Sequence, residues 1–207
     1  MDTITKEITL QTITAQAGDI ADLLTGASVA ADKGKNAIDS LAAVYLSATG
    51  NTVKACASDR YRLIAGVLTV EGEGELSPSA IRLGDVKNIL AAIKSEKVAR
   101  DITFTRAGDS LSVAIGGTSL TVQLGTGTFP PYEHLIPSES VAVGEISFNP
   151  SYMADFGKVP TSKVSKFNKA GAMLTMEFSG ERKPIKVTIP HDTITWAALL
   201  MPMRVNK

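Results

Sequence analysis

The chain repeats one pattern of predicted elements three times: a strand, a short amphipathic helix and then three more strands. Hydrophobic residues recur every three to four positions in the helical segments and every second position in the strand segments, and these two periods distinguish helices from strands. Each unit spans roughly 65–70 residues, which is longer than a solenoid repeat. We therefore predict an α+β fold in which two such units pair within a domain.

The first unit begins with a predicted strand at residues 7–15. The helix that follows has one apolar face, formed by Ile20, Leu23, Leu24 and Ala27. Three strands are predicted next, at residues 40–48, 52–57 and 61–70. Gly50 and Asn51 predict a turn between the first two of them.

The second unit follows the same order, from a strand at residues 79–83 to a strand at residues 119–124. Its helix ends near Lys97 and has an apolar face formed by Val86, Ile89, Leu90 and Ile93. The other two strands are predicted at residues 101–106 and 110–115. Gly108-Asp109 and Gly116-Gly117 are typical of the tight turns that would separate these strands.

A proline-rich connector at residues 129–137 leads to the third unit, which starts with a short strand at residues 145–148. Asn149 is a predicted helix N-cap, with Pro150 at the first helical position. Pro160 is expected to end that helix. The final strands are predicted at residues 172–178, 184–189 and 193–205.

Composition indicates an ordinary globular protein. The 21 Lys and Arg residues balance the 21 Asp and Glu residues, so the chain is not a strongly basic nucleic-acid binder on average, although a local basic patch is compatible with this balance. Cys56 is the single cysteine, so no intramolecular disulfide can form. We see no signal peptide and no membrane-spanning run, and we expect a soluble, cytoplasmic protein.

The chain carries no recognisable catalytic or cofactor motif. Its two histidines, His134 and His191, lack a Cys or His partner at metal-ligand spacing. There is no P-loop, dinucleotide fingerprint or nucleophile elbow. Cys56 lies in an apolar strand, which favours a buried structural thiol over a nucleophile. We therefore predict a protein that is not an enzyme and that needs no cofactor or metal.

Four short segments resemble the β sliding clamp of bacterial DNA polymerase III. Residues 57–63, Ala-Ser-Asp-Arg-Tyr-Arg-Leu, are similar to the family's Ala-Thr-Asp-Gly-His-Arg-Leu. Residues 127–137 are similar to its Gly-Arg-Phe-Pro-Asp-Tyr connector, residues 148–152 to Phe-Asn-x-x-Tyr, and residues 200–205 to the closing Val-Met-Pro-Met-Arg-Leu. The segments occur in the family's order, and the resemblance extends from about residue 13 to residue 205.

The resemblance implies a shortened clamp. Residues 1–137 correspond to a complete domain of two units, similar to the family's middle domain, and residues 138–207 to the second half of its last domain. The first domain and the first half of the last domain have no counterpart. Arg60 stands where the family has glycine, and Pro131 stands where it has an acidic residue. In the family, antiparallel sheets form the outside of a ring and helices line its central hole.

The resemblance also implies a pocket in which replication partners insert a short linear peptide. The implied residues are Ser58, Arg60, Tyr61, Arg62, Leu63, Pro130, Leu135, Leu200, Met201, Pro202, Met203 and Arg204. Leu and Met suit an adaptable apolar floor, and Arg62 and Arg204 suit contacts with peptide carbonyls or acids. The retained units are those that build this pocket. The alternative is that the stripe from Leu199 to Met203 belongs only to the core of a final strand.

The resemblance further implies that the helices, which line the hole of the ring in the family, present basic side chains to DNA phosphates. The candidate lysines are Lys33, Lys35, Lys87, Lys94, Lys97, Lys158, Lys163, Lys166 and Lys169. They lie in or beside the predicted helices, and contacts of this kind would be independent of base sequence. The alternative for each single lysine is an ordinary solvated surface position.

These features together predict a sliding clamp that tethers a replicative polymerase to duplex DNA and binds that polymerase and a clamp loader through their peptide motifs. A family ring contains twelve units, so three units per chain favour a homotetramer, with a trimer or dimer as alternatives. A different class of function stays open: a decoy or adaptor that binds clamp partners without encircling DNA. The truncation suggests a bacteriophage protein that acts in the host cytoplasm.

Overall fold

The computed structural model describes residues 9–96, 100–127, 129, 131–162 and 173–203, which form two antiparallel sheets and three α-helices. The four-stranded sheet has the order β1 (Gln11–Gln16), β4 (Asp101–Ala107), β5 (Ser110–Ile115) and β6 (Thr118–Gln123). The five-stranded sheet has the order β2 (Ala43–Ser58), β3 (Arg62–Arg82), β9 (Ile194–Leu200), β8 (Ile185–Thr188) and β7 (Thr175–Glu177). The predicted α+β class is confirmed.

The helices are short and amphipathic, as the sequence predicts. The apolar face predicted for α1 (Ala17–Ser28) is fully buried. In α2 (Leu83–Ser95), Val86 and Ile89 are buried, while Leu90 and Ile93 are partly buried against the same core. Leu83 begins this helix instead of ending a strand. Lys97, near the predicted end of the helix, lies outside the described residues.

The third helix has the predicted cap. The side chain of Asn149 accepts a hydrogen bond from the backbone N–H of Ser151 (2.9 Å), and Pro150 is the first residue of α3 (Pro150–Asp155). The 3-10 helix η2 (Phe156–Lys158) continues α3 and stops before Pro160. Pro160 cannot donate a backbone hydrogen bond, which is consistent with the end of the helix at this point.

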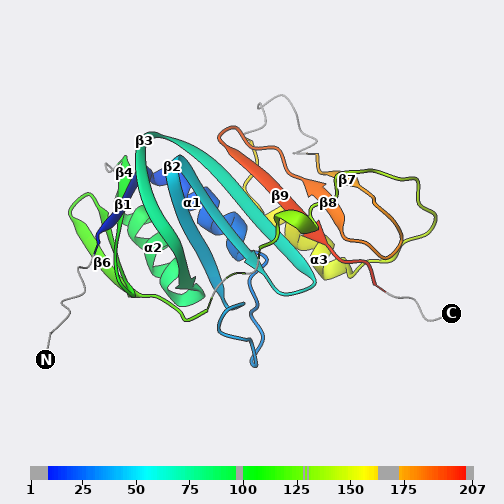
Figure 1. The fold of residues 1–207 in the computed structure, drawn as a ribbon, viewed down its shortest axis with the longest axis horizontal. Helices are drawn as coiled ribbons and strands as arrows, with labels where there is room; N and C mark the ends of the chain where they lie inside the picture. Colours follow the sequence, from blue (N-terminus) through cyan, green and yellow to red (C-terminus); the bar gives the residue numbers. More distant parts are fainter. Residues whose placement is uncertain (1–8, 97–99, 128, 130, 163–172, 204–207) are drawn as a thin grey trace, which may run out of the picture.

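The structure corrects the predicted breaks in the first unit. Residues 43–58 form one strand, β2, and Gly50 (φ +57°) lies inside it at a register shift instead of in a turn between strands. The predicted strands at residues 61–70 and 79–83 are likewise the two ends of β3. Four residues of β3 separate Thr69 from Gly74 at this irregularity, and β3 bends sharply near its middle (Figure 1). The bends allow both strands to continue where the sequence indicates interruptions.

In the third unit, β7, β8 and β9 lie within the three predicted strands, but the first predicted strand is reduced to a single bridge between Ser147 and Met203. β9 pairs with β3 over residues 194–200 and 62–68, so the third unit extends the sheet of the first. The end of the strand predicted for residues 193–205 lies partly outside the described residues.

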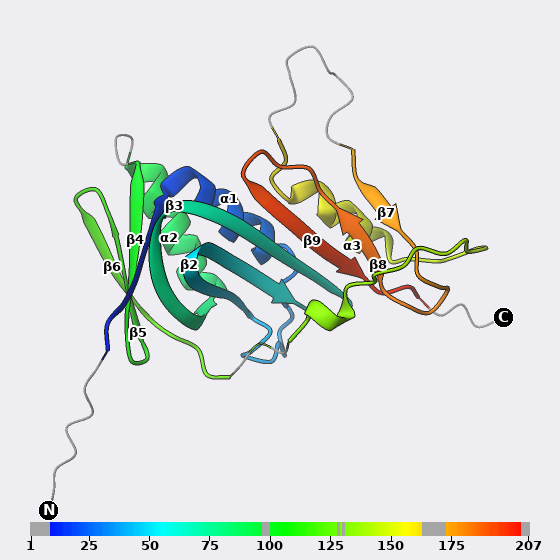
Figure 2. The same cartoon turned by 45° about the horizontal axis from the view of Figure 1, so that its top comes forward.

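The two faces of the five-stranded sheet have different covers. Ile64, Ala198 and Leu200 point to the face that packs against the helices, which we call the helix face. Leu63 and Leu199 point to the opposite face, the connector face, where they pack with residues of the connector. The helices α1 and α2 lie behind the long strands in Figure 1, and Figure 2 shows the same layers after a turn. No helix among the described residues is long and apolar enough to cross a membrane.

Candidate functional site

Three of the sequence segments that resemble the clamp meet where β3 pairs with β9. The β2–β3 turn and the end of β9 are joined by a hydrogen bond from the backbone N–H of Met201 to the carbonyl of Tyr61 (2.8 Å). On the connector face, Tyr132, Phe129 and Ile136 pack with Leu63 and Leu199. The connector, the turn and the last strand therefore form one junction, although up to 140 residues of chain separate them.

Large apolar side chains remain exposed at this junction. Tyr61 is 54% exposed, Leu135 46%, Met201 38% and Met203 54%, and we call these four residues the junction patch. They are four of the eight large hydrophobic side chains that are exposed in the described part of the chain. Such a concentration of apolar surface is typical of a binding site, because soluble proteins usually bury side chains of this size.

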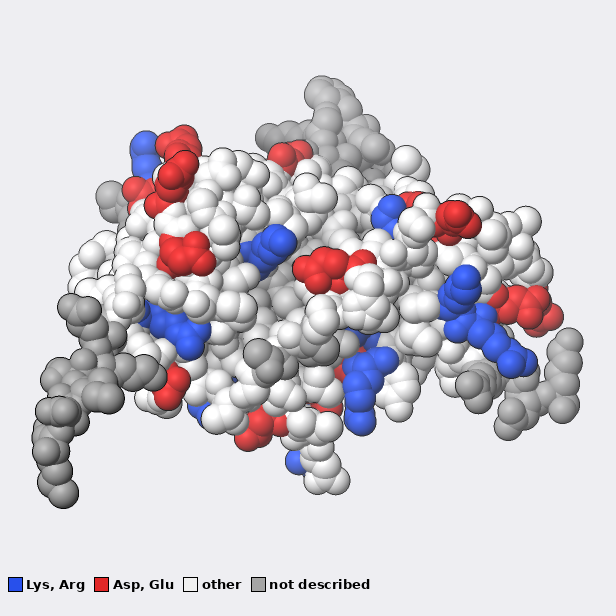
Figure 3. Space-filling model, in the orientation of Figure 1, with Lys and Arg blue, Asp and Glu red and all other residues white. Residues whose placement is uncertain are grey.

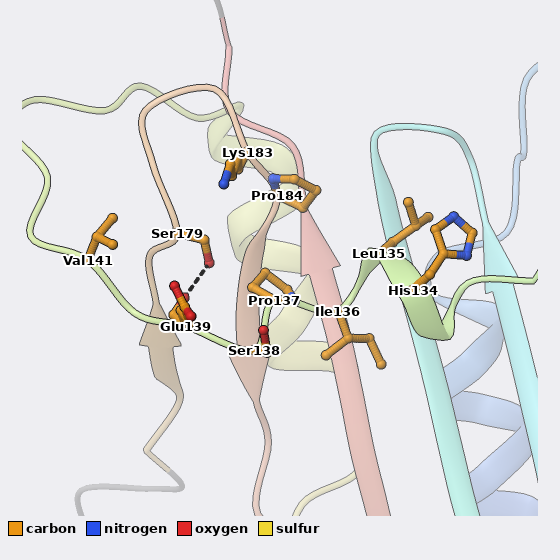
Figure 4. A pocket seen from close by; sticks show the side chains of 10 residues that line it. All are labelled: His134, Leu135, Ile136, Pro137, Ser138, Glu139, Val141, Ser179, Lys183 and Pro184. Atoms are coloured by element: carbon orange, nitrogen blue, oxygen red, sulfur yellow. Dashed lines mark hydrogen bonds between the residues drawn. The ribbon is translucent and has the colours of Figure 1, made fainter.

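A groove adjoins the junction patch at Leu135. It runs between the connector, including the 3-10 helix η1 (Glu133–Leu135), and the β7–β8 turn (Figure 4). Its lining residues are His134, Leu135, Ile136, Pro137, Ser138, Glu139, Val141, Ser179, Lys183 and Pro184. The hydroxyl of Ser179 donates a hydrogen bond to the backbone carbonyl of Glu139 (3.0 Å), which ties the turn to the connector. The lining mixes apolar and polar side chains, with Glu139 and Ser179 between Val141 at one end and Leu135 at the other (Figure 4), a composition that suits an extended peptide.

The β2–β3 turn is fixed by its own polar side chains. One carboxylate oxygen of Asp59 accepts hydrogen bonds from the backbone N–H groups of Tyr61 and Arg62, both 3.0 Å. The hydroxyl of Ser58 accepts from the N–H of Arg60 (3.1 Å) and donates to the carbonyl of Arg62 (2.9 Å). Arg60 has φ +77°, a left-handed conformation that costs a non-glycine residue energy and clusters at functional sites. The turn is thus held rigidly at the edge of the junction patch.

Arg62 is buried, which differs from the contact with a bound peptide that was expected for it from the sequence. Its guanidinium binds Asp59 through Nε (3.0 Å) and Asp155 through Nη1, and it lies 4.5 Å from the centre of the Tyr152 ring. All of these partners belong to the chain itself, so the guanidinium supports the site from beneath instead of reaching a peptide. Tyr152 also stacks on Tyr61, with ring centres 5.9 Å apart.

Asp155 joins this network to the helix side of the molecule. Partial burial raises the pKa of its carboxyl group, but hydrogen bonds from Lys158 and Arg62 outweigh that effect and lower the pKa below the ordinary value. The carboxylate is therefore charged at neutral pH and holds Arg62 and Lys158 together.

The other expected pocket residues take different positions. Leu63 and Leu200 are buried, Leu200 on the helix face within the core, so Leu200 cannot contact a peptide without rearrangement. Pro202 is partly exposed between Met201 and Met203. Pro130 and Arg204 lie outside the described residues. The stripe from Leu199 to Met203 thus divides into a buried part and an exposed part, because the strand ends at Leu200.

Several residues of the junction were missing from the set expected from sequence. Tyr152 belongs to the Phe-Asn-x-x-Tyr segment, whose spacing could have identified it, and Asp155 follows one helical turn later. Tyr132 is 9% exposed, and burial raises the pKa of its hydroxyl group.

Burial also raises the pKa of the Cys56 thiol to about 12, so this thiol stays protonated at neutral pH, in agreement with the predicted buried structural cysteine.

Lys158 forms an ion pair with Asp155, and the charges of Lys158, Lys87 and Asp155 all act on Lys33. The pKa of Lys33 is lowered, first by partial loss of water and then by the positive charges of Arg62, Lys158 and Lys87. Lys33, in the loop after α1, is therefore within electrostatic range of Lys87 on α2 and Lys158 on η2. Lys35 and Lys94 are exposed. Lys97, Lys163, Lys166 and Lys169 lie outside the described residues.

The described residues on the face seen in Figure 3 show no such concentration of one charge. On the face seen in Figure 3, acidic and basic side chains are interspersed. Within the described residues, no group of three or more His, Cys, Asp or Glu side chains could hold a metal ion.

The two sheets, the helices on one side and the β3–β9 junction define the DNA-clamp fold of the bacterial DNA polymerase III β subunit. The chain is similar to the β subunit from Thermotoga maritima, with a TM-score of 0.77 and 17% identity over 99% of this chain and 69% of that one. The β subunit from Pseudomonas aeruginosa gives 0.77 and 14%, and the β sliding clamp from Caulobacter crescentus gives 0.74 and 14%, with the same coverage. No protein-family model matches the sequence, and a comparison with curated proteins finds no match.

Proposed function

We propose that the protein is a sliding clamp, a non-enzymatic processivity factor that encircles duplex DNA and binds replication partners through the junction patch. The observation that carries this proposal is the exposed apolar patch at the β3–β9 junction of a clamp fold that spans 99% of the chain. The solved structures similar to it are themselves named sliding clamps or DNA polymerase III β subunits.

The helix side is the proposed DNA side. The grouping of Lys33, Lys87 and Lys158 supports this orientation, because their positive charges can meet phosphates without contacting bases. Asp19 and Asp22 lie near the start of α1, whereas Lys33 follows its end. The positive electrostatic potential is therefore weaker at the start of this helix. We therefore expect weak contacts that permit sliding, with retention on DNA coming from closure of a ring.

The ring would be built from copies of this chain. In this proposal, residues 1–137 form one complete clamp domain and residues 138–207 form half of another. Four chains then supply six domains, two of them rebuilt from paired halves, and this arithmetic favours a tetramer over a trimer or dimer.

The partner site would use the junction patch as its floor. Met201 and Met203 offer flexible apolar contacts, and Leu135 leads into the groove beside the connector. Arg60 and Lys183 would provide positive charge near the peptide. A polymerase and a clamp loader are the proposed sources of such peptides.

The test of this function is retention on circular DNA. We expect the assembled protein to stay bound to a nicked circular plasmid during gel filtration at about 0.3 M salt, where phosphate contacts are weakened, and to be lost once the plasmid is cut to a linear form. Equal loss from both forms would contradict encirclement and favour the decoy or adaptor.

A further inference from the structure

The outer edge of β6 is an open edge of the four-stranded sheet. At the opposite edge, β1 packs against the bend of β3, where the side chain of Gln11 and Ser77 exchange two hydrogen bonds of 2.9 Å each. No strand among the described residues pairs with the outer side of β6. β6 lies at one end of the long axis of the molecule, and β7 lies toward the other end (Figures 1 and 2).

β6 has few of the features that usually protect an edge strand, and the exception is at its end, where the guanidinium of Arg82 donates a hydrogen bond to the carbonyl of Gln123 (3.1 Å). Its sequence, Thr-Ser-Leu-Thr-Val-Gln, has no charge and no proline, and its six residue pairs with β5 run without a bulge. The edge at β7 is different. β7 has three residues, Glu177 pairs with Lys186 (2.9 Å), and the connector bonds beside it from the N–H of Val141 to the carbonyl of Phe178 (2.7 Å).

The side chains of β6 restrict how another strand can pair with it. Leu120 is partly buried and Val122 is buried against the core, whereas Ser119, Thr121 and Gln123 are exposed. Residues opposite each other in antiparallel strands point to the same face, so a partner must place apolar residues opposite Leu120 and Val122. A second β6 meets this condition when the twofold axis passes midway between the two copies of Thr121, because Leu120 of each copy then lies opposite Val122 of the other.

We propose that β6 pairs in this antiparallel register with β6 of a second copy of the chain, joining two four-stranded sheets into one. This pairing rests on the ring of copies proposed above. Such a ring needs two different contacts between neighbouring chains, and the β6–β6 pairing would be one of them. The absence of charge on β6 means that no like charges oppose each other across the axis. The pairing would also satisfy the backbone groups that the open edge leaves to water.

A charge placed on the axis tests the register directly. Thr121→Lys brings two like charges together, and Thr121→Glu does the same with the opposite sign, so each variant alone should associate at least tenfold more weakly than the wild type. An equimolar mixture should associate again. The matched control is Ser112→Lys, because Ser112 is the exposed neighbour of Thr121 on β5 and lies one strand away from the proposed contact.

The measurement is particle mass by analytical ultracentrifugation over a concentration series, with circular dichroism to confirm folding. We expect the mass of each Thr121 variant to fall to half that of the wild type, while Ser112→Lys keeps the wild-type mass. A wild-type monomer, Thr121 variants that keep the full mass, or a Ser112→Lys variant that dissociates equally would overturn the pairing. Peptide binding to the junction patch, measured on the same variants, reports on the proposed function separately.

Discussion

Arg62 and its partners form the most connected polar group at the junction. The guanidinium is 7% exposed and is shared between Asp59, Asp155 and the ring of Tyr152. A buried charge is costly unless it is paired, so the carboxylates must stay ionised for this arrangement to persist. Through Tyr152, the same group sets the position of Tyr61 in the junction patch.

Replacing Asp155 should show how much its ion pair with Arg62 contributes to stability. Asp155→Asn removes one charged hydrogen-bond partner from Arg62, and we expect the free energy of unfolding at pH 7 to fall by about 1.5–3 kcal/mol. Because the pKa of Asp155 is lowered in the folded protein, its contribution is present above the unfolded pKa of about 3.9 and is lost as the pH falls through the lower folded pKa. The difference between variant and wild type should therefore shrink below about pH 4.

Urea unfolding at pH 7 and pH 3 measures this difference. The control is Asp109→Asn, which alters an exposed aspartate in the β4–β5 turn whose side chain forms no ion pair within the described residues. An equal loss for both variants, or a difference that grows as the pH falls, would contradict the role given to Asp155.

At the scale of elements, the bend of β3 determines how the two sheets meet. Gly74 lies where β1 crosses β3, and a Cβ atom there would collide with the backbone carbonyl of Thr12 and press on the side chain of Ile13. A backbone atom cannot move aside as a flexible side chain can. The absence of a side chain at Gly74 therefore allows β1 and β3 to approach each other this closely.

Gly74→Ala should accordingly be destabilising by about 1–3 kcal/mol, the usual cost of overpacking. Gly72→Ala is the matched control in the same strand, because nothing lies within 4 Å of its added Cβ, and we expect a change within about 0.5 kcal/mol. Thermal unfolding of both variants compares them under identical conditions. Equal stability of the two would mean that β1 does not approach β3 as closely as described.

At the scale of the whole molecule, the junction patch is formed by residues from segments that are far apart in the sequence. Leu135 belongs to the connector and Met203 follows the last strand, and both contribute to the junction patch. The continuous sheet from β2 to β7 carries the end of the last strand beside the β2–β3 turn and the connector, because β9 pairs with β3 instead of forming a sheet of its own.

The double variant Leu135→Ala/Met203→Ala should lose affinity for a labelled clamp-binding peptide by about tenfold to a hundredfold, or ~1.4–2.8 kcal/mol. Leu10→Ala/Ile38→Ala removes two exposed apolar side chains elsewhere and should bind normally. Fluorescence anisotropy gives both affinities, and unchanged binding by the folded Leu135/Met203 variant would exclude the junction patch.

Local patterns in the sequence were sufficient for the elements whose stability is local. The apolar face of α1, the Asn149 cap and the regular strands β4 to β6 follow from periodicity and turn chemistry, because these depend on residues a few positions apart. The segments at the junction were also identifiable, as short motifs in a fixed order.

Tertiary structure decided which members of those motifs are accessible. Leu200 and Met201 are adjacent in sequence, yet Leu200 enters the core and Met201 stays at the surface because β9 ends between them. Arg62 is buried because Asp155, 93 residues later, lies within reach of its guanidinium. The bends within β2 and β3 also depend on pairing between distant segments, so turn signals such as Gly50-Asn51 mark the positions of irregularity without specifying whether the strand ends there.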